Sequence, residues 1–170
     1  MSQWSEFYKT RVNNPEYELY FATQYKKMLD RLSEFKTICE EGCGIGSVSK
    51  ALKHKNIHTR GIDICPDMVY LCHLNNPDMD VRTGNIFTHN AKADVVVTHG
   101  VLEHFPDDSI KLVLDKYKAQ NQRNMHYIPL IGHVTPSFGD ERLLELEYWL
   151  GYNPRWYFTF NDGKDLVLFF

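Results

Sequence analysis

Short apolar runs and segments with helical spacing alternate along most of the chain. From residue 36 onward, four of the apolar runs are each followed by a segment whose apolar residues recur every three or four positions. The first pattern is typical of a β-strand and the second of an amphipathic helix. The pattern predicts strands over 36–40, 58–64, 78–82, 93–99, 124–130, 155–160 and 165–170.

Five segments combine helical spacing with the residues that begin or end a helix. In the first of them, Asn14 is a suitable cap, Pro15 suits the first turn, and Phe21, Tyr25 and Met28 form one apolar face. Another begins with acidic residues and ends with lysines, which complements the helix dipole. These signals predict helices over 14–32, 46–55, 66–74, 106–118 and 137–151.

The order of these elements predicts an α/β fold. Alternating strands and helices favour a parallel sheet with helices on both faces. The Asn-Asp-Gly sequence at 161–163 predicts a hairpin between the last two strands, which makes one strand antiparallel. We therefore expect a doubly wound, seven-stranded, mostly parallel sheet with one antiparallel strand from the hairpin. Ligands of such sheets bind beyond the carboxyl ends of the strands.

Composition and charge are those of a folded protein without a nucleic-acid signature. Hydrophobic residues make up 43% of the 170 residues, which suits one domain over 1–170, and the net charge is −3. No apolar run reaches the roughly 18–20 residues that cross a bilayer, and the N-terminus lacks a signal peptide's apolar centre. We expect a cytoplasmic protein with no membrane partner. The cysteines lack zinc-finger spacing, so we expect reduced packing residues and no metal: Cys39, Cys43, Cys65 and Cys72.

The segment ICEEGCGIGSVSK, at 38–50, places a glycine-rich turn between a strand and a helix. Gly42, Gly44 and Gly46 let a ligand approach the main chain closely. Dinucleotide turns prefer G-x-G-x-x-G, whereas the spacing here is G-x-G-x-G. Glu40 and Glu41 would oppose a phosphate, and no Gly-Lys-Ser/Thr follows, which excludes a P-loop. The segment favours a ligand that is cationic near the turn.

Four segments, in order, resemble motifs of the class I S-adenosylmethionine-dependent methyltransferases, whose cofactor carries a sulfonium and an ammonium group. CEEGCGIG resembles the first motif, GIDICPDMV the second, RTGNIF the adenine-flanking segment, and ADVVVTHGVLEHFPDDSI the fourth-strand segment with its following helix. The resemblance covers residues 38–110. It implies S-adenosylmethionine as the cofactor and a Rossmann-like core over 36–170. The aromatic residues of the segment 1–35 predict an N-terminal helical lid over the cofactor, and a helix that simply packs on the sheet is the alternative.

The resemblance also assigns roles to cofactor-binding residues. Glu40 would attract the ammonium group or order a bridging water, and Asp63 would accept hydrogen bonds from the ribose hydroxyls. The main chain at Asn85 and Ile86 would meet the adenine. Asn85 replaces the family's usual aspartate, and its side-chain oxygen can still accept from the exocyclic amine. The expected set is Glu40, Gly42, Cys43, Gly44, Gly46, Asp63, Ile64, Met68, Asn85, Ile86, Thr98, His99 and Gly100.

Methyl transfer needs positioning more than it needs acid or base chemistry. The methyl carbon is already activated, so a base is required only if the acceptor must lose a proton early. His99 is the candidate base because histidine titrates near neutrality. The alternative role for His99 is that of a polar wall residue against the cofactor. Candidates for contact with the acceptor are Tyr8, Arg11, Tyr17, His104 and His133.

The segment after the fourth strand narrows the choice of acceptor. THGV lacks both the Asn/Asp-Pro-Pro-aromatic motif of adenine-amino methyltransferases and the Pro-Cys of cytosine-carbon enzymes. We therefore expect an N or O acceptor on a small molecule or protein rather than a nucleobase. Two alternatives stay open: another enzyme of S-adenosylmethionine, for aminopropyl transfer or cofactor hydrolysis, and a non-catalytic cofactor-binding partner subunit. Neither the acceptor's identity nor the oligomeric state has a signal in the sequence.

Overall fold

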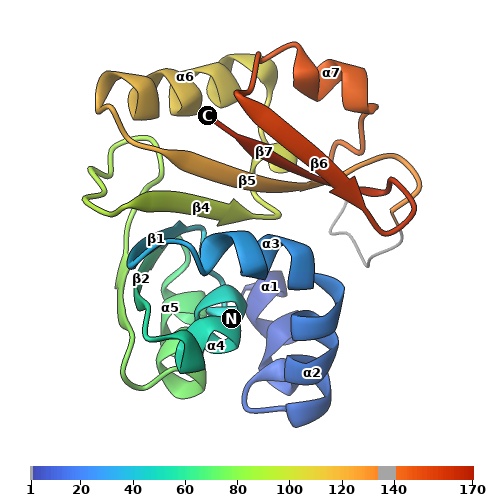
Figure 1. Cartoon of the computed structure of the whole chain (residues 1–170). Helices are drawn as coiled ribbons and strands as arrows, with labels where there is room; N and C mark the ends of the chain where they lie inside the picture. Colours follow the sequence, from blue (N-terminus) through green and yellow to red (C-terminus); the bar gives the residue numbers. More distant parts are fainter. Residues whose placement is uncertain (1, 134–140) are drawn as a thin grey trace.

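The computed structural model describes residues 2–133 and 141–170, and these form a seven-stranded sheet (Figure 1). Every strand lies within two residues of its predicted range, because the apolar runs end where charged residues or turns begin. The strands are β1 Thr37–Glu41, β2 His58–Asp63, β3 Asp80–Thr83, β4 Val95–His99, β5 Asn124–Pro129, β6 Trp156–Phe160 and β7 Asp165–Phe169.

The strand order is β3-β2-β1-β4-β5-β7-β6. β7 runs antiparallel to both β5 and β6, and all other neighbours are parallel. This order confirms the predicted fold class, including the single antiparallel strand. From β1 the chain proceeds outward to β2 and β3 and then returns to β4 on the other side. The carboxyl ends of β1 and β4 therefore border a crevice of the kind in which open α/β sheets bind ligands.

Helices cover both faces of the sheet (Figure 1). α6 and α7 pack on one face, and α1 to α5 lie on the other. None of the helices in the described part of the chain is long and apolar enough to cross a bilayer. The helices are α1 Gln3–Tyr8, α2 Pro15–Gln24, α3 Lys26–Leu32, α4 Ser47–Leu52, α5 Pro66–Asn75, α6 Asp107–Ala119 and α7 Leu146–Leu150, with 3-10 turns at Lys9–Arg11, Lys53–Lys55 and Leu102–His104.

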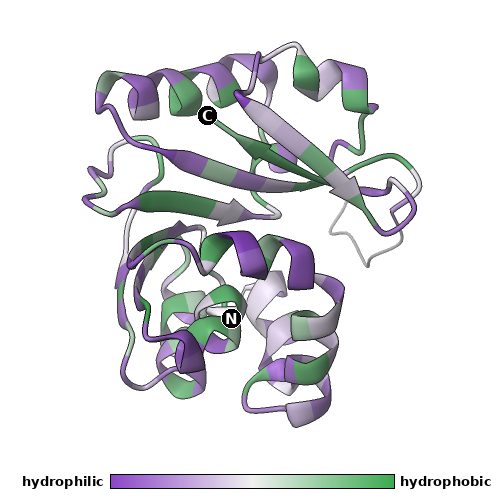
Figure 2. Ribbon diagram, in the orientation of Figure 1, coloured by the Kyte–Doolittle hydropathy of each residue, from purple (hydrophilic) through white to green (hydrophobic). Residues whose placement is uncertain are grey.

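The central strand β4 shows why the core has two halves. Val95 and Val97 belong to the cluster that includes α2, α3 and α4, whereas Val96 belongs to the cluster that includes Ile110 and Val113 of α6. Alternate residues of a strand face opposite sides of the sheet. All three valines are fully buried, as the uninterrupted β-branched run predicts. Figure 2 shows the same concentration of hydrophobic residues along β4 and β7.

The predicted helix at 14–32 is two helices rather than one. Asn14 caps α2 as expected, since its side-chain oxygen accepts from the main-chain N–H groups of Glu16 and Tyr17. The helical conformation stops at Tyr25, which has φ −101° and ψ 15°, and resumes in α3. The Tyr25 ring is buried against Tyr127 of β5. Tertiary packing of this ring thus accompanies a break that the continuous apolar spacing did not indicate.

The predicted helix at 137–151 is wrong at residues 141–145 and correct at Leu146–Leu150. Only Leu146–Leu150 is helical, and residues 141–145 are not. The main-chain N–H of Arg142 donates to the carbonyl of Glu103, and the carbonyl of Leu144 accepts from Ile131. These bonds to distant segments replace the bonds of a helix. The remainder of the prediction, at 137–140, lies outside the described residues.

Candidate functional site

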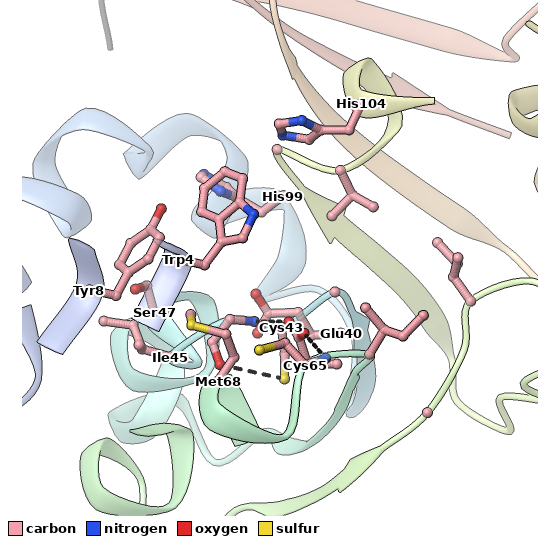
Figure 3. A pocket seen from close by; sticks show the side chains of 18 of the residues that line it. Trp4, Tyr8, Glu40, Cys43, Ile45, Ser47, Cys65, Met68, His99 and His104 are labelled. Atoms are coloured by element: carbon pink, nitrogen blue, oxygen red, sulfur yellow. Dashed lines mark hydrogen bonds between the residues drawn. The ribbon is translucent and has the colours of Figure 1, made fainter. Parts of the chain in front are cut away.

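A cavity of about 420 Å³ opens at the carboxyl ends of β1, β2 and β4. Its size is within the range of small-molecule sites. One side is formed by the glycine turn after β1 and by residues that follow β2 and β3, and the other by α1, α2 and the loop after β4. Figure 3 shows these sides facing each other, with Glu40, Cys43 and Met68 below the rings of Trp4 and His104.

The glycine turn is fixed to the end of β2. The main-chain N–H groups of Gly42 and Cys43 donate to the carbonyl of Ile62 at 2.8 and 2.9 Å, and that of Gly44 donates to Asp63 Oδ2 at 2.9 Å. Gly44 has φ +54°, which favours glycine, and an added Cβ would meet only the Met68 side chain, at 3.5 Å. The main chain at Gly44 is therefore open to a ligand in the cavity.

Glu40 brings a buried carboxyl group to this cavity. Its exposed fraction is 2%, and the Ser49 hydroxyl is 3.5 Å from Oε2. Burial holds the pKa of Glu40 well above its usual value, with the nearby Cys72 thiol contributing in the same direction. A buried carboxyl group that lines a cavity is a favourable site for a cationic group, because the cation offsets the loss of hydration.

Asp63, at the end of β2, supports the turn and lines the cavity at the same time. Its Oδ1 accepts from the main-chain N–H of Cys65 at 2.9 Å, and its Oδ2 accepts from Gly44. Burial raises the pKa of Asp63, and these two hydrogen bonds oppose that shift. Each carboxylate oxygen has two lone pairs, so both oxygens retain the capacity to accept from a ligand hydroxyl.

Asn85 and Ile86 form the cavity wall that follows β3. The Asn85 side-chain oxygen accepts from the main-chain N–H of Phe87 at 2.9 Å. This turn uses one lone pair of the oxygen that the sequence suggested for an exocyclic amine, so a ligand would share that oxygen with Phe87. Ile86 is 8% exposed and presents an apolar surface beside it.

His99 lines the cavity at the end of β4, and its ring is enclosed by aromatic side chains. The ring stacks on Tyr127 with centroids 4.2 Å apart and meets the rings of Tyr25 and Phe21 at 4.4 and 5.1 Å. Burial lowers the pKa of His99 to about 3. Its Nε2 is buried and has no hydrogen-bond partner among the described residues. A general base works best with a pKa near the working pH, so this geometry favours the role of a wall residue.

The segment before β1 contributes an aromatic wall. Trp4 and Tyr8 of α1 and Tyr17 and Phe21 of α2 all line the cavity. The Trp4 ring stacks on that of Tyr8 with centroids 6.2 Å apart, and it meets the edge of His104 at 5.4 Å. The cavity thus joins a polar, glycine-rich half to an aromatic half.

Comparison with known proteins agrees with this arrangement. Residues 39–117 match the family model described as "Methyltransferase domain". The match spans less than half of the chain, and it shows that this segment is similar to the methyltransferase domains of that family. The cofactor of this family is S-adenosylmethionine.

The proteins to which the chain is similar are distant relatives. The chain is 30% identical over 82 residues to a ubiquinone biosynthesis O-methyltransferase of Hydrogenovibrio crunogenus, an alignment that covers 44% of this chain and 34% of that protein. The chain therefore spans about a third of that relative's length. Similar solved structures are the PH0226 protein of Pyrococcus horikoshii OT3 (TM-score 0.75, 13% identity, 96% and 97% of the two chains covered) and magnesium protoporphyrin IX methyltransferase of Synechocystis PCC 6803 with bound S-adenosylhomocysteine (TM-score 0.64, 17% identity, 88% and 84% covered).

Most residues expected to bind the cofactor line the cavity, but two do not. Ile64, Met68 and Gly100 line it together with those described above. Gly46 does not, because it packs against α5, where an added Cβ would lie 2.7 Å from the Asn76 side chain. Thr98 is fully buried, and its hydroxyl pairs with His126 Nδ1 at 2.8 Å. Thr98 faces His126 rather than the cavity because alternate residues of β4 point to opposite sides of the sheet.

Two of the five residues expected to contact the acceptor also lie elsewhere. Tyr8, Tyr17 and His104 line the cavity, whereas Arg11 and His133 do not. The Arg11 guanidinium donates to a main-chain carbonyl within its own segment at 2.5 Å and lies 3.7 Å from an aromatic ring centroid. His133 Nδ1 is 2.7 Å from a carboxylate oxygen at the start of β7. Neither side chain lines the cavity, although the Arg11 guanidinium lies 5.5 and 5.6 Å from the ring centroids of Tyr8 and Tyr17, which do.

Several cavity residues carried no chemical signal in the sequence. Phe21 has the spacing of a core residue, and it is buried as such, but its ring also reaches the cavity. Phe87 and Phe105 come from loops after β3 and β4 and meet with ring centroids 5.2 Å apart. Ile45 and Ser47 lie within the glycine segment itself, so their position next to Gly44 and Gly46 was the available signal.

Proposed function

We propose that the chain binds S-adenosylmethionine in this cavity and transfers its methyl group to an N or O atom of a small molecule or protein rather than of a nucleobase. The observation that carries the proposal is the meeting of Glu40, the Gly44 main chain and Asp63 in one cavity, within the segment that matches the family. These groups come from the ends of β1 and β2, where doubly wound sheets bind their ligands.

The residues present fit this cofactor. Glu40 offers a buried carboxyl group for a cationic substituent, Gly44 offers an open main chain, and Asp63 offers two acceptor oxygens for ribose hydroxyls. Asn85 and Ile86 provide a polar edge and an apolar face for a base. When bound, S-adenosylmethionine supplies a methyl carbon that the sulfonium has already activated. The protein then has to hold an acceptor in line with that carbon and exclude water.

The aromatic half of the cavity supports a small, largely apolar acceptor. Trp4, Tyr8 and Phe21 offer ring surfaces, and His104 offers a polar group at the same side. Such a wall suits a flat molecule with a hydroxyl or amino group. The Hydrogenovibrio crunogenus relative is named as an O-methyltransferase, which is consistent with an oxygen acceptor.

Calorimetry tests the cofactor half of this proposal. S-adenosylmethionine and S-adenosylhomocysteine should bind to the purified chain, and NAD should not, because its pyrophosphate would meet the Glu40 carboxyl group. Either sulfur ligand at 100 times its dissociation constant should stabilise the fold by about 2.7 kcal/mol, visible as a higher melting temperature. Tighter binding of NAD than of either sulfur ligand would contradict the assignment.

Product analysis tests the reaction. Incubation of the chain with S-adenosylmethionine and a panel of phenols and amines should yield S-adenosylhomocysteine only when an acceptor is present. Release of methylthioadenosine, or cofactor loss that no acceptor changes, would favour the other enzyme classes. Binding without turnover on any acceptor would favour a non-catalytic partner subunit.

A further inference from the structure

Glu41 is a buried carboxylate that the cofactor cavity does not use. It is 0% exposed and follows Glu40 in β1, so it lies on the opposite face of the sheet. Three donors surround it: Lys116 Nζ and Tyr117 Oη from α6, at 3.0 and 2.6 Å from Oε2, and His89 Nδ1, at 2.7 Å from Oε1. Neither Glu41 nor these partners line the cavity.

Two of these contacts reach the same loop, the connection between β3 and β4. Residues 84–94 of this connection contain no helix or strand. His89 lies in it, and the Lys116 ammonium group also donates to the carbonyl of Ile86 at 2.5 Å. The main-chain N–H of His89 donates in turn to the carbonyl of Asn85 at 3.0 Å. The loop therefore contains a compact turn that is linked to the Glu41 carboxylate directly through His89 and indirectly through Lys116.

A metal site is the other arrangement that these side chains suggest. Ligand atoms of Cys39, Glu41 and His89 lie within 4.8 Å of one another. However, the Lys116 ammonium group already sits 3.0 Å from the Glu41 carboxylate, where it would repel a divalent cation. The cation in this cluster is therefore the lysine.

We propose that Glu41 and Lys116 are positioning residues that hold the Asn85–His89 turn in the shape that receives the base end of the cofactor. Asn85 and Ile86 line the cavity, whereas Glu41 and Lys116 reach it only through the main chain of Ile86. This inference rests on the proposed function, since it assigns the turn to the adenine. It adds a role for two residues that do not touch the ligand.

Fold stability alone is a weak reason for such a pair. The Lys116 side chain is 11% exposed and that of Glu41 is 0% exposed, so both groups lose most of their hydration. Buried ion pairs are often no more stabilising than neutral groups of the same size. The contact from Lys116 to a cavity-lining main chain is what distinguishes this pair from one that only packs.

Two ligands test the adenosine end and the amino-acid end of the cofactor separately. S-adenosylhomocysteine carries both the adenosine and the amino-acid group, whereas 5′-methylthioadenosine lacks the amino-acid group. We expect Lys116→Met to weaken the binding of both by roughly tenfold, since each presents the same base to the turn. Glu40→Gln should weaken S-adenosylhomocysteine and leave 5′-methylthioadenosine nearly unchanged. Lys116→Arg should restore part of the lost affinity, because it can donate to the same two oxygens.

The double variant Glu41→Gln/Lys116→Met distinguishes positioning from stability. It leaves no unpaired charge, so its melting temperature should recover most of what Lys116→Met loses. Its affinity for both ligands should stay low, and hydrogen exchange of the amides at 86–89 should remain faster than in the wild type. Lys111→Met is the matched control on α6, since Lys111 is exposed and pairs with exposed Asp115 at 3.6 Å.

The outcomes are distinct for the two proposals. If the wild type binds neither adenosine ligand, the proposed function fails. If the wild type binds both and Lys116→Met binds them equally well, the positioning role is overturned. Recovery of affinity in the double variant along with its melting temperature would assign the pair to folding and would also overturn the proposal.

Discussion

Asp63 combines two tasks in one side chain. Its carboxylate holds the main chain of the glycine turn through Gly44 and remains in contact with the cavity. In contrast, the side-chain oxygen of Asn85 accepts a hydrogen bond from the main-chain N–H of Phe87. Asn85 therefore lines the cavity mainly as part of a turn. Both residues were expected to bind the cofactor, but the structure leaves Asp63 with more side-chain acceptor capacity toward the cavity than Asn85.

We predict that Asp63→Ala weakens S-adenosylhomocysteine binding more than Asn85→Ala does. Charge-assisted hydrogen bonds contribute roughly 1.5–3 kcal/mol each, so loss of one or two should lower the affinity at least about tenfold. The Asn85 variant keeps its main-chain contacts and should lose only a few-fold, by about 1 kcal/mol or less. Calorimetry measures both. Equal losses for the two variants would show that Asp63 does not bind the ribose.

His99 should behave as a neutral side chain across the physiological range. Because burial holds its pKa at about 3, we predict that its imidazole stays neutral from about pH 8 down to about pH 5. Nitrogen NMR of the histidine rings, with His99→Gln to assign the signal, measures this directly. The same variant should change S-adenosylhomocysteine affinity only a few-fold. A titration midpoint near the ordinary value of about 6.5 would revive the role of a general base.

Among the secondary-structure elements, α1 and α2 both place aromatic side chains against the cavity, and α1 contributes Trp4 and Tyr8. Ser2 caps α1 through the main-chain N–H of Ser5, and its own main-chain N–H donates to Asp67 of α5 at 2.8 Å. α5 in turn packs beside β2 and β3. This chain of contacts sets Trp4 beside the cavity, and the lid role of residues 1–35 stays a prediction.

The position of α1 predicts that tryptophan fluorescence reports ligand binding. Trp4 lines the cavity, whereas Trp149 of α7 is buried and Trp156 lies on the outermost strand β6. Addition of S-adenosylhomocysteine should therefore change the fluorescence of the wild type and of Trp156→Phe. The change should disappear in Trp4→Phe. An undiminished change in Trp4→Phe would mean that α1 does not lie against the bound ligand.

At the scale of the whole molecule, burial of Glu40 lowers the stability of the free protein at high pH but provides a carboxyl group for a cationic ligand. Its folded-state pKa is raised above the ordinary value of 4.5, so the folded protein holds a proton that the unfolded chain releases. Stability is then fully present below that value and falls as the pH rises toward the folded-state pKa. A cationic ligand beside the carboxyl group reverses this cost by favouring the charged form.

We predict that Glu40→Gln makes the free protein more stable and the complex weaker. The amide keeps the shape and carries no titrating proton, so its advantage over the wild type should grow as the pH rises from about 5 to about 8. Chemical unfolding at several pH values measures this. The stabilisation that S-adenosylhomocysteine gives should increase with pH in the wild type but not in the variant. A variant that gains no stability at high pH would show that burial of Glu40 is not costly.

Much of the fold follows from local pattern. The strands end near where the apolar runs end, and the Asn-Asp-Gly turn closes the hairpin as predicted, because period and turn chemistry are properties of neighbouring residues. The glycine turn was identified in the same way, since it follows directly from a strand end, whereas Asp63 was identified from the resemblance of GIDICPDMV to a family motif. The carboxyl ends of parallel strands meet at one edge of the sheet, so these residues converge.

What the tertiary structure decided concerns residues that are far apart in the sequence. Glu40 and Glu41 are adjacent and alike, yet one reaches the cavity and the other is enclosed by α6, because β1 turns successive side chains to opposite faces and only packing determines what covers each face. Tyr25 breaks a helix whose spacing is continuous, and Thr98 binds His126 rather than facing the cavity. The sequence by itself determined the strands, most of the helices, their order along the chain and the end of the sheet that binds a ligand. The depth of each side chain and the partner of each buried polar group were decided by tertiary contacts, which local pattern does not encode.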